Sequence, residues 1–219
     1  MTGRRLERIR QVLDRRQPDL TVIMENLHKS HNFSAIVRTC DAVGILRTHA
    51  VAAAGELPRH NDTAGGSHRW VQVQRHHRLA TAVAEARDLG MQVLAAHVGP
   101  GAVDFREPDY TRPTALLMGS ELYGVSDDAV ALADRPLMIP MQGMVESLNV
   151  SVATAVILYE AQRQREAAGM YGHRRLDRAS YDRLLFEWAQ PRLARWCRRR
   201  GLPYPPLDED GDVRSPPEW

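Results

Sequence analysis

The chain has 219 residues, of which 43% are hydrophobic and 26% are charged, enough for one sizeable core with an appendage. No apolar run approaches the ~20 residues that a membrane span needs, and the charged N-terminal segment lacks the apolar stretch of a signal peptide. The two cysteines, Cys40 and Cys197, exclude a disulfide framework and a four-cysteine zinc site. We therefore expect a cytoplasmic protein with no membrane partner.

Charge is unevenly distributed along the chain, although the formal net charge is only +2. Residues 1–16 carry +4, 17–162 carry −5, 163–200 carry +7 and 201–219 carry −4. Every basic residue except Lys29 is an arginine, whose planar guanidinium suits bidentate contacts with phosphate, although a high-GC genome also favours arginine. Basic ends around a slightly acidic middle are typical of an RNA-binding protein with an enzymatic centre.

Hydrophobic periodicity predicts strands that alternate with helices. In chain order the first elements are a helix over 3–16, a strand over 20–25, a helix over 32–43, a strand over 48–53, a loop over 61–67 and a strand over 71–74. The later elements are a helix over 79–89, strands over 91–96 and 114–118, a short helix over 126–133, a strand over 136–139 and a long helix over 149–166. This alternation predicts an α/β fold with a mainly parallel sheet.

The long helix and the C-terminal end have distinctive compositions. Asn149 is a suitable N-cap for the helix, and its first half, 150–159, is apolar on nearly every face. Such a helix is buried on both sides, so we expect one side to meet a second subunit. The Pro-rich, acidic end after residue 201 predicts an extended tail.

The sequence lacks residues that a phosphate-binding loop, a dinucleotide-binding loop and a metal site would need. Gly119 and Gly124 have the spacing of a phosphate loop, but Val125 stands where that loop needs lysine. Gly99-Pro-Gly101 continues without the third glycine of a dinucleotide loop. No pair of histidines with helical spacing has a carboxylate on the same helix, so we expect no metal site.

Three segments combine polar residues with tight turns after predicted strands, where open α/β sheets bind their ligands. In 31–39, Asn32 lies at the mouth of a helix that also carries Ser34 and Arg38; alone, this pattern also fits a local cap and a solvated arginine. In 116–124, two glycines flank Glu121, which also fits an ordinary strand-to-helix turn.

The third segment, 139–152, contains an apolar strand end, a loop rich in unbranched apolar residues and a capped helix. Such a loop could enclose an adenine, whose faces favour apolar contacts while its edges accept backbone hydrogen bonds. A loop packed on the core, with Ser147 and Asn149 as local caps, fits the same residues.

In this order and spacing, the three segments resemble the motifs of the SPOUT family of RNA methyltransferases. Residues 15–22 and 200–205 are also similar to the branch that methylates guanosine ribose in tRNA, so the resemblance covers essentially the whole chain. It implies an α/β SPOUT domain over 18–165 with a deep trefoil knot at about 90–165. A basic helical extension, 1–17, precedes this domain, and a second helical extension with the acidic tail, 166–219, follows it.

The resemblance also implies a homodimer, with the active site across its interface, and S-adenosyl-L-methionine as the cofactor. The implied cofactor-binding residues are His97, Met118, Gly119, Ile139, Met141 and Leu148. The implied catalytic residues are Asn32, Arg38, Glu121, Ser147 and Asn149.

The implied reaction transfers the sulfonium methyl group to the ribose 2′-oxygen of a D-loop guanosine, at tRNA position eighteen. Arg38 is the residue expected to act on the 2′-hydroxyl. It acts either as a literal base or as a group that orients the hydroxyl and stabilises developing negative charge, because arginine holds its proton strongly.

The basic ends are the expected tRNA-binding surfaces. The residues involved are Arg4, Arg5, Arg8, Arg15, Arg16, His31, Arg163, Arg165, Arg174 and Arg175. Each one alone also fits a solvated helix face, but the whole set predicts strongly salt-dependent binding. Two alternatives remain: a SPOUT 2′-O-methyltransferase for ribosomal RNA or the tRNA anticodon, and a non-catalytic RNA-binding protein on the same scaffold.

Overall fold

The structure, a computed structural model, describes residues 2–52 and 69–213, so the predicted loop 61–67 lies outside the described residues. The chain forms two compact units. The sheet unit comprises residues 17–170, and the helical unit comprises the described residues 2–16 and 171–213. The two terminal extensions, which the sequence presents as separate segments, therefore belong to one unit.

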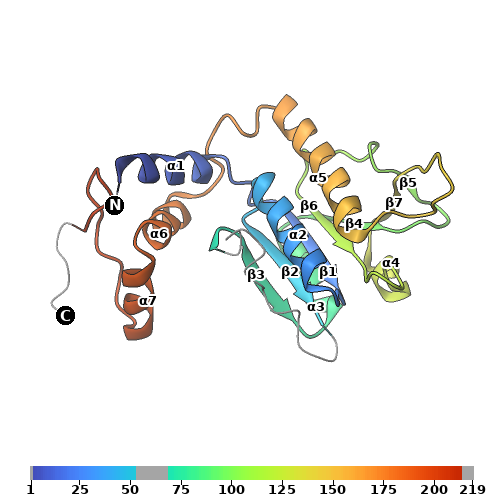
Figure 1. Cartoon of the computed structure of the whole chain (residues 1–219), viewed down its shortest axis with the longest axis horizontal. Coiled ribbons are helices and arrows are strands. Elements are labelled where there is room, and N and C mark those ends of the chain that lie inside the picture. The colour runs from blue at the N-terminus through green and yellow to red at the C-terminus, as the bar shows by residue number, and fades with distance from the viewer. Residues whose placement is uncertain (1, 53–68, 214–219) are drawn as a thin grey trace. The chain divides into compact units, whose positions relative to one another are not determined.

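The sheet unit is built on a seven-stranded sheet in which every described pairing is parallel (Figure 1). The strands are β1 (Leu20–Glu25), β2 (Arg47–Val51), β3 (Gln72–His76), β4 (Gln92–Ala96), β5 (Val103–Asp104), β6 (Thr114–Met118) and β7 (Arg135–Met138). Their spatial order is β3-β2-β1-β6-β4-β7-β5. The α/β class with a parallel sheet is thus confirmed, while the knotted path stays a prediction.

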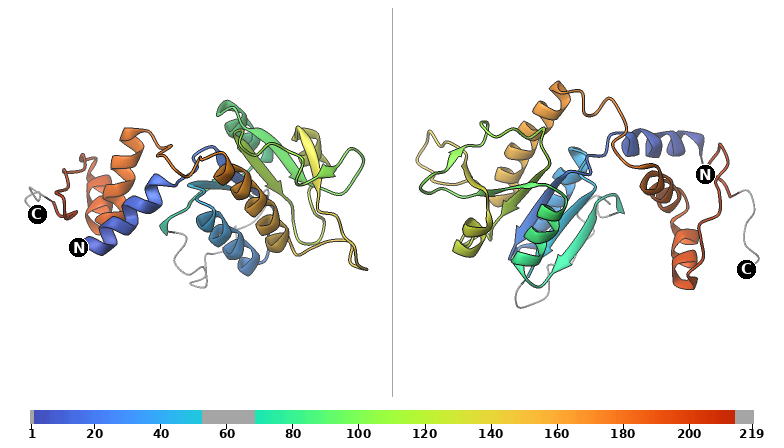
Figure 2. Two further views of the ribbon diagram at one scale, coloured as in Figure 1. Left: turned by 90° about the horizontal axis from the view of Figure 1, so that it is seen from above. Right: turned by 180° about the vertical axis from the view of Figure 1, so that it is seen from behind.

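Helices cover both faces of this sheet (Figures 1 and 2). On one face α2 (Ser30–Ala42) and α5 (Val150–Ala167) pack against each other and against one hydrophobic core cluster. On the other face α3 (Leu79–Asp88) and α4 (Asp127–Leu132) pack on a second cluster. Burial on both faces explains why β1 and β6 are continuous runs of buried residues rather than alternating ones.

Two helices of the sheet unit begin at a side chain that caps the first turn. Asn149 precedes α5 and accepts a hydrogen bond from the backbone N–H of Ser151, as the N-cap prediction requires. Ser126 caps α4 in the same way by accepting from the N–H of Ala129. Both caps lie directly after loops that leave the sheet, so they fix where those loops end.

The helical unit contains α1 (Gly3–Asp14), α6 (Arg178–Ala189) and α7 (Pro191–Arg200). The predicted helix near the N-terminus is present as α1, and its buried residues Leu6, Ile9 and Leu13 form an apolar stripe. The prediction of an extended tail is wrong up to residue 213. Leu207 pairs with Val213, and both pack beside a cluster that includes Phe186 and Leu193, because the tail carries apolar residues as well as acids. No described helix is both long and apolar enough to span a membrane.

Candidate active site

A pocket of about 410 Å³ opens at the carboxyl ends of the adjacent strands β6, β4 and β7. Its wall comes from these strand ends, from the loops 119–124 and 139–149, and from the first turns of α5. All six residues predicted to bind a cofactor line it: His97, Met118, Gly119, Ile139, Met141 and Leu148. The prediction that ligand chemistry collects at this edge of the sheet therefore agrees with the geometry.

The lining combines apolar and polar residues. Leu137 and Ile157 are buried apolar residues of the lining, whereas Glu121, Ser147 and Asn149 line the pocket as polar groups. An apolar concavity with a few placed polar groups is the usual form of a small-molecule site.

Gly119 is required where β6 enters the 119–124 loop. A Cβ atom built on this glycine would lie 2.0 Å from the backbone carbon and oxygen of Gly124. The loop folds back on itself at this point, and Ser120 and Gly124 exchange backbone hydrogen bonds of 2.9 and 3.0 Å. Any side chain at position 119 would therefore force the pocket wall to move.

Three of the five predicted catalytic residues form one hydrogen-bonded group. The Nδ2 of Asn32 donates to Glu121 at 2.9 Å, and the Nδ2 of Asn149 donates to the Oδ1 of Asn32 at 3.2 Å. Glu121 also accepts from the backbone N–H groups of His28 and Lys29, at 3.2 and 3.0 Å. Although partial burial opposes ionisation, these hydrogen bonds lower the pKa of Glu121. The group joins all three predicted segments through an ionised carboxylate.

The other two predicted catalytic residues are placed differently. Ser147 is exposed and lines the pocket. Arg38 is exposed on α2, the helix that carries Asn32, and is not among the residues that line the pocket of its own chain. The described residues therefore bring four of the five to one place and leave Arg38 outside it.

The predicted tRNA contacts divide into exposed and buried side chains. Those at least partly exposed are Arg4, Arg5, Arg8, Arg15, His31, Arg163, Arg174 and Arg175. Arg16 and Arg165 are fully buried. The guanidinium carbon of Arg16 lies 5.3 Å from the centroid of the Trp188 ring. This burial favours a structural role over a phosphate contact for these two residues.

Arg165 instead joins α5 to the strands. Its guanidinium donates to Asp19 Oδ1 at 2.7 Å and to the carbonyls of Tyr110, Asp19 and Arg112 at 2.8 to 3.2 Å. A buried charge is tolerated when it is paired and hydrogen-bonded in this way. Arg165 is thus a structural residue of the sheet unit.

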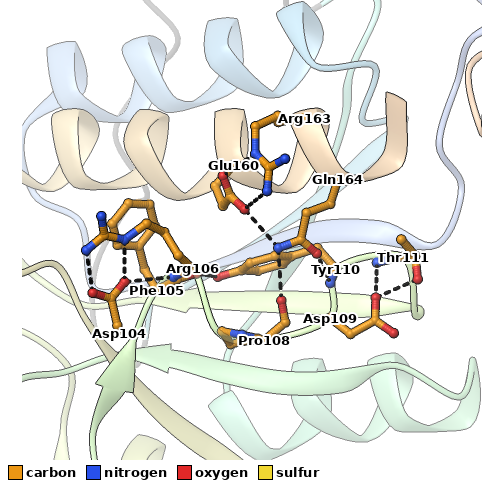
Figure 3. A network of polar contacts seen from close by, with 10 residues as sticks. All are labelled: Asp104, Phe105, Arg106, Pro108, Asp109, Tyr110, Thr111, Glu160, Arg163 and Gln164. Carbon is orange, nitrogen blue, oxygen red and sulfur yellow. Dashed lines mark hydrogen bonds and ion pairs between the residues drawn. The ribbon is translucent and has the colours of Figure 1, made fainter. Parts of the chain in front are cut away.

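Figure 3 shows that polar contacts also hold α5 against the segment 104–111. Gln164 accepts from the N–H of Tyr110 and donates to the Pro108 carbonyl, at 2.9 and 3.1 Å. On the same helix, Arg163 donates to both oxygens of Glu160 at 2.8 Å. A phosphate that binds Arg163 would therefore have to compete with an existing bidentate ion pair.

Among the described residues, one group contains three potential metal ligands, His49, His76 and Glu85, which the sequence does not reveal because they come from β2, β3 and α3. The Nδ1 of His49 lies 2.9 Å from the Nε2 of His76. Two nitrogens bound to one tetrahedral zinc ion are about 3.3 Å apart, so the observed spacing is that of a hydrogen bond between the rings. Burial, followed by the His76 and Arg47 charges, lowers the pKa of His49 to about 4, which keeps it neutral near pH 7.

Fold and site together define a SpoU-type methyltransferase. Residues 19–159 match the SpoU rRNA Methylase family, and residues 163–216 match the C-terminal SpoU rRNA methylase model. The chain belongs to the SpoU methylase family.

Two relatives are tRNA (guanosine(18)-2′-O)-methyltransferases. The tRNA (guanosine(18)-2′-O)-methyltransferase of Escherichia coli is 52% identical over all of this chain and 96% of the relative. The enzyme of that name from Thermus thermophilus is 56% identical over 85% of this chain and 96% of the relative.

Solved structures agree with this assignment. The TrmH/SpoU tRNA modifying enzyme of A. aeolicus has a TM-score of 0.80 and 47% identity, over 84% of this chain and 94% of that one. The SpoU methyltransferase AviRb of Streptomyces viridochromogenes, solved with AdoMet, has a TM-score of 0.62 and 27% identity, over 70% of this chain and 62% of that one.

Proposed function

We propose that this protein transfers a methyl group from S-adenosyl-L-methionine to the ribose 2′-oxygen of guanosine 18 in the D-loop of tRNA. The observation that carries this proposal is the 52% identity to the E. coli enzyme of that function, which extends over the whole chain. It includes both segments of the helical unit, which the minimal SPOUT scaffold lacks.

The pocket fits the proposed cofactor in size and chemistry. Its volume of about 410 Å³ lies within the range of about 300 to 1,000 Å³ that is typical of small-molecule sites. His97, Met118, Gly119, Ile139, Met141 and Leu148 would hold the cofactor, and the missing side chain at Gly119 lets the backbone approach it. When bound, S-adenosyl-L-methionine supplies an electrophilic methyl group on a sulfonium.

The protein's own residues must orient the 2′-hydroxyl, whose proton passes to water as the methyl group is transferred, and stabilise the negative charge that develops on its oxygen. A guanidinium suits this task as a donor, because arginine keeps its proton at neutral pH. We assign this role to Arg38. Asn32, Glu121 and Asn149 then hold the loops around the pocket in position, and Ser147 provides an exposed polar group in the pocket lining.

A homodimer would complete the site. Arg38 is exposed outside the pocket of its own chain, so a second copy of the chain can supply it. Large apolar side chains are exposed next to the pocket and on α5: Leu122, Tyr123, Met144, Val145, Val152 and Tyr159. Such a concentration of exposed apolar residues favours an interface, and it agrees with the expected second subunit on α5.

The helical unit is the proposed tRNA-binding part. Its sequence segments carry a net charge of +6, against −4 for the sheet unit. Exposed arginines on this scale attract a polyanion through release of its counterions. A tRNA substrate also implies a cytoplasmic location.

Transfer of labelled methyl groups from the cofactor to an unmodified tRNA transcript tests the function. We expect 2′-O-methylguanosine at position 18, and no label in a matched transcript with 2′-deoxyguanosine there, because the acceptor oxygen is missing. Label on a base, at position 34 or only in ribosomal RNA would contradict the proposal. Cofactor binding that is absent while tRNA binding persists would favour the non-catalytic alternative.

A further inference from the structure

Two loops leave the sheet side by side and face each other. β1 and β6 are hydrogen-bonded neighbours, aligned from the pair Leu20 and Thr114 to the pair Met24 and Met118. The segment 26–29 follows β1 and leads into α2, while the segment 119–126 follows β6 and leads into α4. Because the strands are parallel and in register, both segments start at the same edge of the sheet.

Carboxylates connect the two parts of the chain in both directions: Glu121 holds the 26–29 segment and Asn32, and Glu25 at the end of β1 holds the end of the 119–126 segment. Glu121, in the second segment, accepts from the N–H groups of His28 and Lys29 and from the Asn32 side chain. In the opposite direction, Glu25, the last residue of β1, accepts from the backbone N–H of Ser126 at 3.1 Å and from its hydroxyl at 2.7 Å. We call this reciprocal arrangement the carboxylate clasp.

In the contact between Glu25 and Ser126, the Glu25 side chain is buried and the Ser126 hydroxyl uses its one hydrogen. Glu25 is 6% exposed, so the two hydrogen bonds from Ser126, rather than water, satisfy its carboxyl oxygens. The Ser126 hydroxyl donates its only hydrogen to Glu25 and accepts from the N–H of Ala129 at 3.2 Å. Glu25 therefore fixes the point at which the loop ends and α4 begins.

The loop that Glu25 holds is a wall of the pocket. Gly119, Ser120, Glu121, Leu122 and Gly124 line the pocket, whereas Glu25 and Ser126 do not. The loop is fixed at its start by the close crossing at Gly119, in its middle by Glu121, and at its end by Glu25. Without the last contact, the segment between Gly124 and α4 would lose its hydrogen bonds to β1.

We propose that Glu25 is a positioning residue for methyl transfer: by holding Ser126 it sets the position of the 119–124 wall, and with it the cofactor. Glu25 touches neither substrate nor cofactor in this account. The proposal rests on the proposed function, since it assumes that the pocket binds S-adenosyl-L-methionine. The loss of Glu25 should weaken cofactor binding more than it slows turnover, because the wall moves while Arg38 does not.

The test measures the cofactor dissociation constant, KM for the cofactor, kcat and the melting temperature in three variants. In Glu25→Ala both acceptors are lost, and we expect the dissociation constant and KM to rise about tenfold, with kcat at saturating cofactor changed less than threefold. In Glu25→Gln one acceptor oxygen remains, and in Ser126→Ala the backbone contact remains, so we expect rises of about threefold. These milder variants keep the test decisive if Glu25→Ala does not fold.

A matched control separates positioning from stability. Glu85 on α3 also accepts a side-chain hydrogen bond, from Gln74 at 2.6 Å, but lies outside the pocket lining. We expect Glu85→Gln to leave cofactor binding unchanged, whatever its effect on melting. A wild-type dissociation constant in Glu25→Gln and Ser126→Ala, with only the melting temperature lowered, would overturn the positioning role. Failure of the wild-type protein to bind cofactor would instead overturn the proposed function, and this proposal with it.

Discussion

In the sheet unit, Asn32, Glu121 and Asn149 come from three separate segments and are joined by hydrogen bonds of 2.9 and 3.2 Å. In the helical unit, exposed arginines pair with carboxylates of their own unit, as Arg174 does with Asp14 and Arg178 with Asp182. The first arrangement fixes geometry, because removing one partner leaves the others unsatisfied. The second distributes charge, because exposed ion pairs are individually weak and screened by salt. Single substitutions should therefore have large effects at the pocket and small effects in the helical unit.

The largest expected effect is that of Arg38→Ala on turnover. Loss of a donor that stabilises developing charge lowers kcat by about 100- to 1,000-fold in other enzymes, and we expect a similar loss in methyl transfer. Because Arg38 does not line the pocket of its own chain, cofactor affinity measured by equilibrium binding should stay within about twofold. If the variant lost cofactor binding instead, neither role considered for Arg38 would stand.

The next largest effect is the loss of cofactor affinity expected at Gly119, where the 119–124 loop folds back on itself. Gly119→Ala places a Cβ 2.0 Å from the Gly124 backbone, and overpacking of this kind costs about 1 to 3 kcal/mol or more. We expect cofactor affinity, measured by calorimetry, to fall by about 100-fold. Gly3→Ala is the control, since nothing lies within 4 Å of that added Cβ. Unchanged affinity in Gly119→Ala would mean that this wall does not contact the cofactor.

A third prediction concerns His49, which is hydrogen-bonded to His76 in the sheet unit, outside the pocket. The folded protein holds the pKa of His49 at about 4, against about 6.5 in an unfolded chain. As the pH falls below about 6.5, His49 binds a proton in the unfolded state but not in the folded state, so the free energy of unfolding falls. Between pH 7 and pH 5 this group should reduce the free energy of unfolding by about 2 kcal/mol.

Urea unfolding at the two pH values checks this effect. The wild-type protein should lose about 2 kcal/mol more than His49→Gln does, because the other titrating groups are common to both proteins. Equal losses in the two proteins would show that His49 does not carry the pH dependence.

The smallest effect is expected for one arginine of the helical unit. Arg8 is exposed on α1, and one exposed charge contributes about 0.2 to 1 kcal/mol. Arg8→Ala should weaken tRNA binding, measured by filter binding, only about twofold to fivefold, and should reduce the slope of log affinity against log salt by about one. A loss as large as that of Arg38→Ala in turnover would contradict the distributed role of this unit.

Most of the fold is predictable from the sequence, because apolar periodicity is a local signal. The strands Leu20–Glu25 and Thr114–Met118 have the predicted bounds, and the long helix differs by one residue at each end. β5 is not predictable, since two residues, Val103 and Asp104, carry no periodicity. The packing of the two ends of the chain into one unit also cannot be predicted from local sequence patterns.

The pocket lining is predictable because family motifs carry it, but individual side-chain environments are not. Arg163 and Arg165 look alike in the sequence, yet one is exposed and the other is buried against Asp19, 146 residues away. Glu25 meets Ser126 across 101 residues, and neither belongs to a motif that singles it out. Long-range pairing decides which polar residues hold the site, and one sequence does not contain that pairing.

The division of roles between the two units is tested most directly by measuring both affinities of the wild-type protein over the same range of salt. The tRNA affinity should fall steeply, with a slope of log affinity against log salt of about −4 or steeper if about five phosphates are contacted. The cofactor affinity should change by no more than about twofold, because its pocket binds through shape and hydrogen bonds. A tRNA affinity that barely responds to salt, or a cofactor affinity that falls in parallel with it, would contradict the account.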